Sequence, residues 1–271
     1  MKKFFFLLFF ALSINVFSQE TIESKFAIPD GFEREIVSDY HKWVISQPLK
    51  EDNKVFEYDG DEKPNYRNGS EIWAAVFDYD LGTHEYHQCA DASMYLNARY
   101  NWESKNFSKM AFHSCSGDLI NYEDYLKGAS YNLINNGQNL DTKIYPENSR
   151  TDNLNNFEKW MIKVWAWANT WSLVNRNDVE SINIMNLRPG DIFIEAGALC
   201  RIMGHAISVV DIIINKETGN KKYMLAQSYY PGQEQHVLLN SLTDDVWYDL
   251  NEKDVVTPDW LFLSTDLKRF K

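Results

Sequence analysis

Three polar residues in separate parts of the chain have the types and the order that nucleophilic catalysis requires. Cys89 lies where an apolar run, residues 72–79, gives way to a segment with helical spacing. A helix N-terminus favours the anionic form of a cysteine, and the thiolate is the nucleophile. His205 begins the apolar run GHAISVVD, residues 204–211, which is typical of a half-buried strand. The pair predicts a thiol nucleophile and an imidazole base, within about 4 Å of each other.

A third polar group must orient the imidazole, and it commonly comes from the neighbouring strand. Residues 223–230 follow the turn-rich connection NKETGN, so they predict the returning strand of a hairpin. They offer Gln227 and, as the alternative, Ser228, because the register of the hairpin decides which side chain faces the ring. Gln88, directly before the cysteine, is the candidate for an oxyanion or substrate contact.

Simpler explanations of the same side chains remain open. Cys89 could be a small core residue behind a helix, and His205 could be a strand end whose ring bonds a backbone carbonyl. His84, His87 and Cys89 form the pattern H-x-x-H-x-C, whose ligand types suit zinc. The spacing matches no common structural zinc pattern, so we expect no metal and no other cofactor.

The elements that must position these residues divide the chain into a helical first part and a strand-rich last third. The predicted helices are residues 32–47, 88–100, 121–126 and 157–171. The predicted strands are residues 54–58, 72–79 and 110–113, followed by 187–197, 204–214, 221–230 and 235–240. Residues 127–155 have no periodic pattern and predict a loop. Helices first and an antiparallel sheet afterwards indicate the α+β class, as a single domain over residues 19–271.

The first eighteen residues are typical of a secretory signal peptide. Lys2 and Lys3 precede an apolar stretch, and Val16 and Ser18 occupy the −3 and −1 positions of a cleavage site. The apolar stretch is shorter than the roughly 20 residues of a membrane-spanning helix. We therefore expect an exported protein, periplasmic or extracellular, with no stable membrane insertion after cleavage.

The composition of the full chain limits the classes of partner that it can bind. Its 44% hydrophobic and 15% aromatic residues are sufficient for a packed core. The formal charge of −12 argues against nucleic acid, because phosphates require a basic surface. A peptide or cell-wall ligand is the expectation that remains. Of the three cysteines, Cys115 and Cys200 are the pair whose disulfide would leave Cys89 free.

A cysteine at a helix start, a histidine on a strand and a polar residue on the next strand resemble the NlpC/P60 and papain-like cysteine peptidases and amidases. The phrase LRPGDIFI…GHAISVVD is similar to the second half of that module. The resemblance implies a papain-like fold and a thiol hydrolase that acts on amide bonds, such as those of cell-wall peptides. The sequence around the cysteine, residues 87–91, is HQCAD and departs from the Asp-Cys-Ser or glycine-rich lead usual in that superfamily.

A closer resemblance covers almost the whole mature chain. It is carried by WVISQPLK (43–50), VFEYDG (55–60), FDYDLGTHEYHQCADASMYLNARY (77–100), GHAISVVD and LAQSYYPGQE (225–234). These segments, in this order, are similar to the bacterial domain-of-unknown-function family 4846, which implies a unit without implying an activity. Two hypotheses follow: a papain-like thiol hydrolase, or a non-catalytic domain that binds peptide or glycan. The exposure of Cys89 discriminates between them, since a working thiol must be reachable.

We predict that the exported protein begins at Gln19, because cleavage after Ser18 satisfies the small-residue requirement. Intact-mass spectrometry of the secreted species measures this directly. A membrane-bound species that retains Met1 would contradict the prediction.

Overall fold

A large antiparallel sheet forms the centre of the protein. The computed structural model describes residues 19–67, 69–79, 82, 84–135, 139–198, 203–251 and 253–271. The strand order of the sheet is β2-β11-β10-β9-β8-β15-β7, with β1 beside β9 and β12 beside β10. Its strands are β1 Phe32–Arg34, β2 Trp73–Val76, β7 Val179–Ser181, β8 Asp191–Glu195, β9 His205–Asn215, β10 Lys221–Gln227, β11 His236–Leu238, β12 Tyr248–Asp249 and β15 Leu267–Phe270. The protein is therefore mixed α/β with a large antiparallel sheet, as the sequence predicts at that level.

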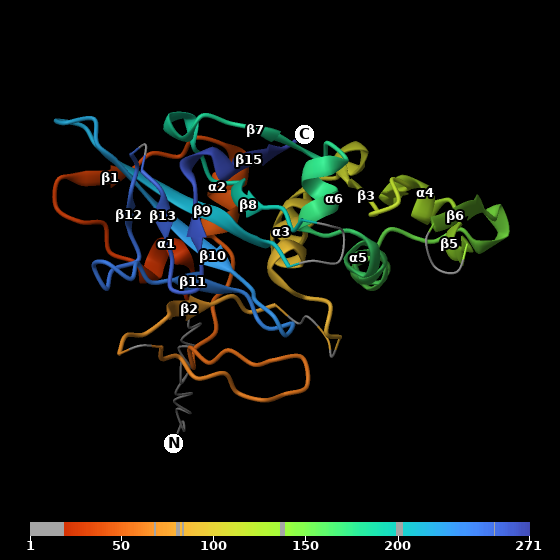
Figure 1. Cartoon of the computed structure of the whole chain (residues 1–271), viewed down its shortest axis with the longest axis horizontal. Coiled ribbons are helices and arrows are strands. Elements are labelled where there is room, and N and C mark those ends of the chain that lie inside the picture. The colour runs from red at the N-terminus through yellow and green to blue at the C-terminus, as the bar shows by residue number, and fades with distance from the viewer. Residues whose placement is uncertain are drawn as a thin grey trace, which may run out of the picture.

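The helices and three small strand pairs surround this sheet. The helices are α1 Ile22–Lys25, α2 Asp39–Ile45, α3 Cys89–Glu103, α4 Tyr122–Leu126, α5 Leu154–Trp167 and α6 Thr170–Asn175. The pairs are β3 Ala111–His113 with β4 Leu119–Asn121, β5 Ala129–Ile134 with β6 Asn139–Ile144, and β13 Val255–Val256 with β14 Leu261–Phe262. Figure 1 shows the sheet toward one end of the molecule and α4, α5 and the β5–β6 pair toward the other, with α3 between them.

Strands β9 and β10 form the hairpin that the sequence predicts. They pair antiparallel from Lys221 opposite Ile214 to Ala226 opposite Ser208. The turn between them is stabilised by Asn215, whose side-chain oxygen accepts from the backbone N–H groups of residues 217 and 218. Both faces of β9 are covered by apolar clusters, which explains why its sequence is apolar almost throughout.

Helix α3 packs against β9 and thereby places its own N-terminus beside the start of that strand. In the buried interface the Ser208 hydroxyl donates to the Ser93 hydroxyl at 2.9 Å. The helix begins at Cys89, as predicted, and Asp91 caps it by accepting from the Gln88 backbone N–H at 3.0 Å.

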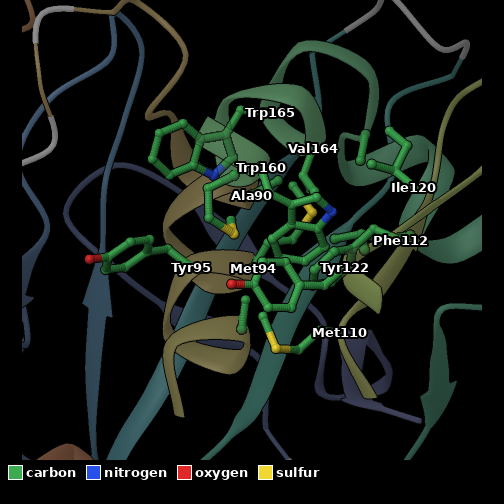
Figure 2. Close-up of a cluster of buried hydrophobic side chains, with 14 of the residues drawn as sticks. Ala90, Met94, Tyr95, Met110, Phe112, Ile120, Tyr122, Trp160, Val164 and Trp165 are labelled. Atoms are coloured by element: carbon green, nitrogen blue, oxygen red, sulfur yellow. The ribbon is translucent and has the colours of Figure 1, made fainter. Parts of the chain in front are cut away.

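The other face of α3 contributes to a second core, shared with α5, β3 and α4. Met94 and Tyr95 of α3 meet Phe112 of β3 and Trp160 of α5, and all four side chains are almost fully buried. Figure 2 shows this cluster gathered beside the α3 ribbon. The aromatic residues of the predicted long helix thus serve packing, because they bury large apolar areas.

The predicted helix at residues 32–47 is wrong in its first half. Residues 32–34 form β1, which pairs with residues 213–215 of β9, and the helix starts only after its cap Ser38. Strand pairing with β9 outweighs the helical spacing, because Arg34 of β1 also forms an ion pair with the buried Asp211.

Three further predictions are corrected in the same way. Residues 127–155 are not a loop, since they contain the β5–β6 hairpin. The predicted helix 157–171 is interrupted, because Ala168 is extended and Asn169 caps a separate helix, α6. Residues 54–58 form only isolated bridges, between Phe56 and Glu62 and between Glu57 and Gln233.

No helix in the described ranges is long and apolar enough to cross a membrane. The predicted signal peptide, residues 1–18, lies outside the described residues.

We predict that Asp211→Asn lowers the free energy of unfolding by about 3 kcal/mol, because a buried ion pair that loses one charge leaves the other uncompensated. Asp211 is fully buried, and its carboxylate accepts from Arg34 Nε at 2.9 Å and contacts His41 Nε2 at 2.7 Å. Urea unfolding measures the change. The control Asp249→Asn removes an exposed ion pair with Lys222 and should change stability by less than about 1 kcal/mol. Equal effects of the two substitutions would contradict the prediction.

Candidate active site

A cleft of about 220 Å³ opens where α3 and β9 both begin. Its walls are the first turn of α3, the N-terminus of α6 with Asn169 and Thr170, the start of β9, residues 229–230 and Trp260. Cys89 and His205 both line it. The cleft thus brings together five separate segments of the chain.

Cys89 is partly exposed and faces this cleft, which argues against a core residue hidden behind the helix. Its Sγ donates to the Gly204 carbonyl oxygen at 4.0 Å. Burial raises the pKa of the Cys89 thiol to about 11, although the backbone N–H of Ala206 acts in the opposite direction. The prediction that the helix end makes this cysteine a thiolate is therefore wrong for the free protein, because desolvation outweighs the helix.

His205 is held by a chain of hydrogen bonds that extends through Gln227 to Asp259. Its Nε2 lies 2.9 Å from Gln227 Oε1, and Gln227 Nε2 donates to Asp259 Oδ2 at 2.7 Å. Asp259 in turn forms an ion pair with Arg67. Burial lowers the pKa of His205 to about 4, while the bond from Gln227 raises it. The imidazole is consequently neutral at pH 7.

These bonds determine which nitrogen of His205 carries the proton. A carboxylate only accepts, so Gln227 turns its NH₂ group to Asp259 and its oxygen to the ring. That oxygen also only accepts, so the His205 proton is on Nε2. Nδ1 then keeps a lone pair, and within the described residues it has no hydrogen-bond partner. The ring therefore has the form that a general base requires.

The thiol and the imidazole do not form a hydrogen bond with each other in the described part of the chain. Their approach to within about 4 Å thus stays a prediction, and so do the catalytic roles of Cys89, His205 and Gln227. Catalytic hydrogen bonds are often long in the absence of substrate and tighten when it binds.

The remaining predicted residues differ in where they lie. Ser228 is not the partner of His205, because its hydroxyl lies 2.7 Å from the carbonyl oxygens of His87 and Gln233. Gln88 lines the cleft, with its side-chain amide bonded to the Glu85 carbonyl oxygen at 3.3 Å. Its role as an oxyanion or substrate contact stays a prediction.

The alternative metal site finds no support in the geometry. His84 is exposed, whereas His87 is buried with Nδ1 at 2.9 Å from the Gln233 carbonyl oxygen. Among the described residues, no three His, Cys, Asp or Glu side chains are grouped so that they could hold a metal ion.

Cys89 is a free cysteine, whereas Cys115 is disulfide-bonded. Cys200, its predicted partner, lies outside the described residues.

Gly204 is required by the close approach of three segments. A Cβ atom at this position would lie 2.2 Å from the Glu195 carbonyl oxygen and 2.7 Å from the Thr170 hydroxyl. The sequence predicts this close approach from the glycine before His205. A larger residue would push β9 away from α6 and deform the cleft.

Several site residues could not be found from the sequence. Asp259 lies in a turn thirty-two residues after Gln227, and nothing in its surroundings marks it. Tyr229 and Trp260 place their rings 5.0 and 5.2 Å from the His205 ring. Of these residues, only Tyr229 could have been placed beside His205 from the sequence. It follows Gln227 by two positions, and alternate residues of a strand share a face.

Comparison with known proteins gives a family and no relative of known activity. A family model described as a domain of unknown function (4846) matches residues 22–269. No curated protein and no solved structure matches the chain. The resemblance to NlpC/P60 peptidases therefore has no support from these comparisons.

We predict that histidine ring NMR of ¹⁵N-labelled protein shows His205 as the Nε2–H tautomer, because Gln227 Oε1 only accepts. In Asp259→Ala, Gln227 can turn, and part of the population should change to Nδ1–H. The change should be incomplete, because His236 Nε2 remains 3.5 Å from the Gln227 amide nitrogen. His87 is the internal control, since its bond to a carbonyl oxygen fixes Nδ1–H in both proteins. A wild-type His205 with its proton on Nδ1 would contradict the prediction.

Proposed function

Because the chain belongs to the domain-of-unknown-function family 4846, whose name states no activity, we propose its function from the cleft: an exported thiol hydrolase that cleaves amide bonds. Cys89 is the nucleophile, His205 the general base and Gln227 the residue that orients the base. The expected substrates are peptides, such as those of the cell wall.

The observation that carries this proposal is the His205–Gln227–Asp259 chain of hydrogen bonds. A histidine that only ends a strand needs one backbone carbonyl to be satisfied. His205 instead has its Nε2 fixed by a buried amide, while its other nitrogen keeps a lone pair in a ring that lines the same cleft as a free, partly exposed thiol. An oriented base and a free thiol in one cleft are two of the features that nucleophilic catalysis by cysteine requires, and they support the proposal.

The reaction follows from the neutral state of both groups. The Cys89 sulfur attacks the carbonyl carbon of the amide while its proton passes to His205 Nδ1, which makes the ring cationic. The tetrahedral intermediate then expels the amine, and His205 returns the proton to the leaving nitrogen. A water molecule, deprotonated by His205, hydrolyses the thioester and releases the carboxylic acid and the free thiol.

The proposal includes a papain-like architecture, and the order of the elements supports it. The cysteine begins a helix, the histidine begins a strand, and the polar third residue comes from the next strand of the same antiparallel sheet. The third residue is an amide rather than a carboxylate. It orients the ring without adding a charge to the cleft.

The second candidate is a non-catalytic domain that binds peptide or glycan in the same cleft. It is favoured by the high thiol pKa and by the lack of a hydrogen bond between Cys89 and His205. Tyr229, Tyr230 and Trp260 give the cleft an aromatic surface that such a ligand could contact.

We predict that purified mature protein hydrolyses peptides from a cell-wall digest, and that Cys89→Ala abolishes this activity. His205→Ala should lower kcat by about 10²- to 10⁴-fold, the usual contribution of a general base. Mass spectrometry of the products measures both effects.

The matched control is His84→Ala, which removes an exposed histidine outside the cleft and should leave the rate unchanged. Circular dichroism verifies that each variant is folded. Binding of the same peptides without hydrolysis, equal in wild type and Cys89→Ala, would replace the hydrolase with the binding domain.

A further inference from the structure

Asp91 lines the same cleft, and one oxygen of its buried carboxyl group has no hydrogen-bond partner. Its Oδ2 accepts from the Gln88 backbone N–H at 3.0 Å, whereas Oδ1 is buried without a hydrogen bond. The side chain belongs to a residue that is only 6% exposed. Helix capping accounts for the hydrogen bond that Oδ2 accepts. It does not account for the second carboxyl oxygen, Oδ1, because an asparagine or a serine can cap a helix as well.

Comparison with the other buried aspartates makes this feature unusual. The described residues contain two more, Asp191 and Asp211, and each is paired with an arginine, Arg269 or Arg34. Asp91 has no such partner, and the described residues that line the cleft include no lysine or arginine. A buried carboxyl without a cation is costly, and such groups concentrate at functional sites.

The surroundings of Asp91 suit a cationic ligand. Tyr230 and Trp260 line the same cleft, and aromatic faces attract ammonium groups. The ring of Tyr229, which also lines the cleft, already has Lys63 Nζ 5.1 Å from its centroid. Burial raises the pKa of the Asp91 carboxyl well above its ordinary value. An incoming ammonium group would favour the carboxylate and thereby gain a charge-assisted hydrogen bond.

We propose that Asp91 binds a protonated amino group of the substrate, so that the substrates are peptides with a free amine close to the cleaved bond. The proposal rests on the thiol hydrolase function proposed above and names its substrate class. Asp91 follows Cys89 by two positions, and its carboxyl is near enough to act on the Cys89 thiol, whose pKa is raised by burial and also by this carboxyl. The amine therefore belongs within one or two residues of the attacked carbonyl, because a residue spans about 3.5 Å.

Cys89 itself can report this preference without any hydrolysis. Two methanethiosulfonate reagents of similar size are compared at pH 7.5, the cationic 2-aminoethyl reagent and the neutral propyl reagent. Their relative rates on wild type are divided by their relative rates on a small free thiol, which corrects for intrinsic reactivity. We expect the cation to be favoured about tenfold or more, the usual strength of a charge-assisted bond. Cys89→Ser gives the blank.

Asp91→Asn should abolish this preference, since the amide keeps the helix cap and loses the charge. The matched control is Asp124→Asn, which changes an exposed aspartate at the equivalent position of α4 and should leave the preference intact. An unchanged preference in Asp91→Asn, or none in wild type, would overturn the proposal.

A measurement on wild type alone covers the case in which Asp91→Asn does not fold. L-alaninamide should slow the reaction of Cys89 with the neutral reagent, whereas N-acetyl-L-alaninamide, which has no ammonium group, should not. Equal protection by the two compounds would refute the ammonium site. If Cys89 prefers the cationic reagent but the protein hydrolyses no peptide, the ammonium site is retained and the hydrolase function is rejected. If the protein hydrolyses peptides but Cys89 shows no preference for the cationic reagent, the hydrolase function is retained and the ammonium site is rejected.

Discussion

The contact between helix α3 and strand β9 determines where every part of the cleft lies. Ser93 and Ser208 join the two elements by a buried hydrogen bond, one helical turn beyond Cys89. Cys89 is the first residue of the helix and His205 the first residue of the strand, so a shift of one element along the other would separate them. The interface resists such a shift because close-packed side chains leave no space for sliding. The cleft therefore depends on residues that never contact a ligand.

The same packing keeps the candidate catalytic groups uncharged. Burial disfavours both the thiolate and the imidazolium, so the pKa of Cys89 rises while that of His205 falls. Gln227 orients the ring without a charge, and the nearest carboxylate in that chain, Asp259, is already paired with Arg67. In the reaction proposed for this cleft, the proton would move only as the sulfur attacks, and desolvation of the cleft by a ligand would strengthen the hydrogen bonds that assist the transfer.

The sequence predicts those parts of the protein whose causes are local. The β9–β10 hairpin can be read because an apolar run, an Asx turn at Asn215 and a second apolar run are contiguous. The start of α3 can be predicted as well, and with it the position of Cys89.

Strand β1 could not be predicted, because the partners of residues 32–34 are about 180 residues away. The β5–β6 hairpin leaves Leu133, Ile134 and Ile144 exposed and buries little more than Leu140 and Ala129, so it lacks the alternation of a half-buried strand. Burial is likewise invisible in the sequence, which is why the thiolate prediction failed.

The buried carboxylates of the sheet are paired with arginines, whereas the buried carboxyl group of Asp91 in the cleft is not. Arg269 of β15 neutralises Asp191 of β8, and Arg34 of β1 neutralises Asp211 of β9, so each pair ties one strand to its neighbour. At the N-terminal end of β9, no cation among the described residues performs this task for Asp91. A buried carboxyl group that has no cationic partner in the protein does not contribute to stability. Such groups are expected at functional sites. A ligand that supplies the missing charge would recover the cost of burying that carboxyl, and binding would then depend on the ligand's own cation rather than on its size.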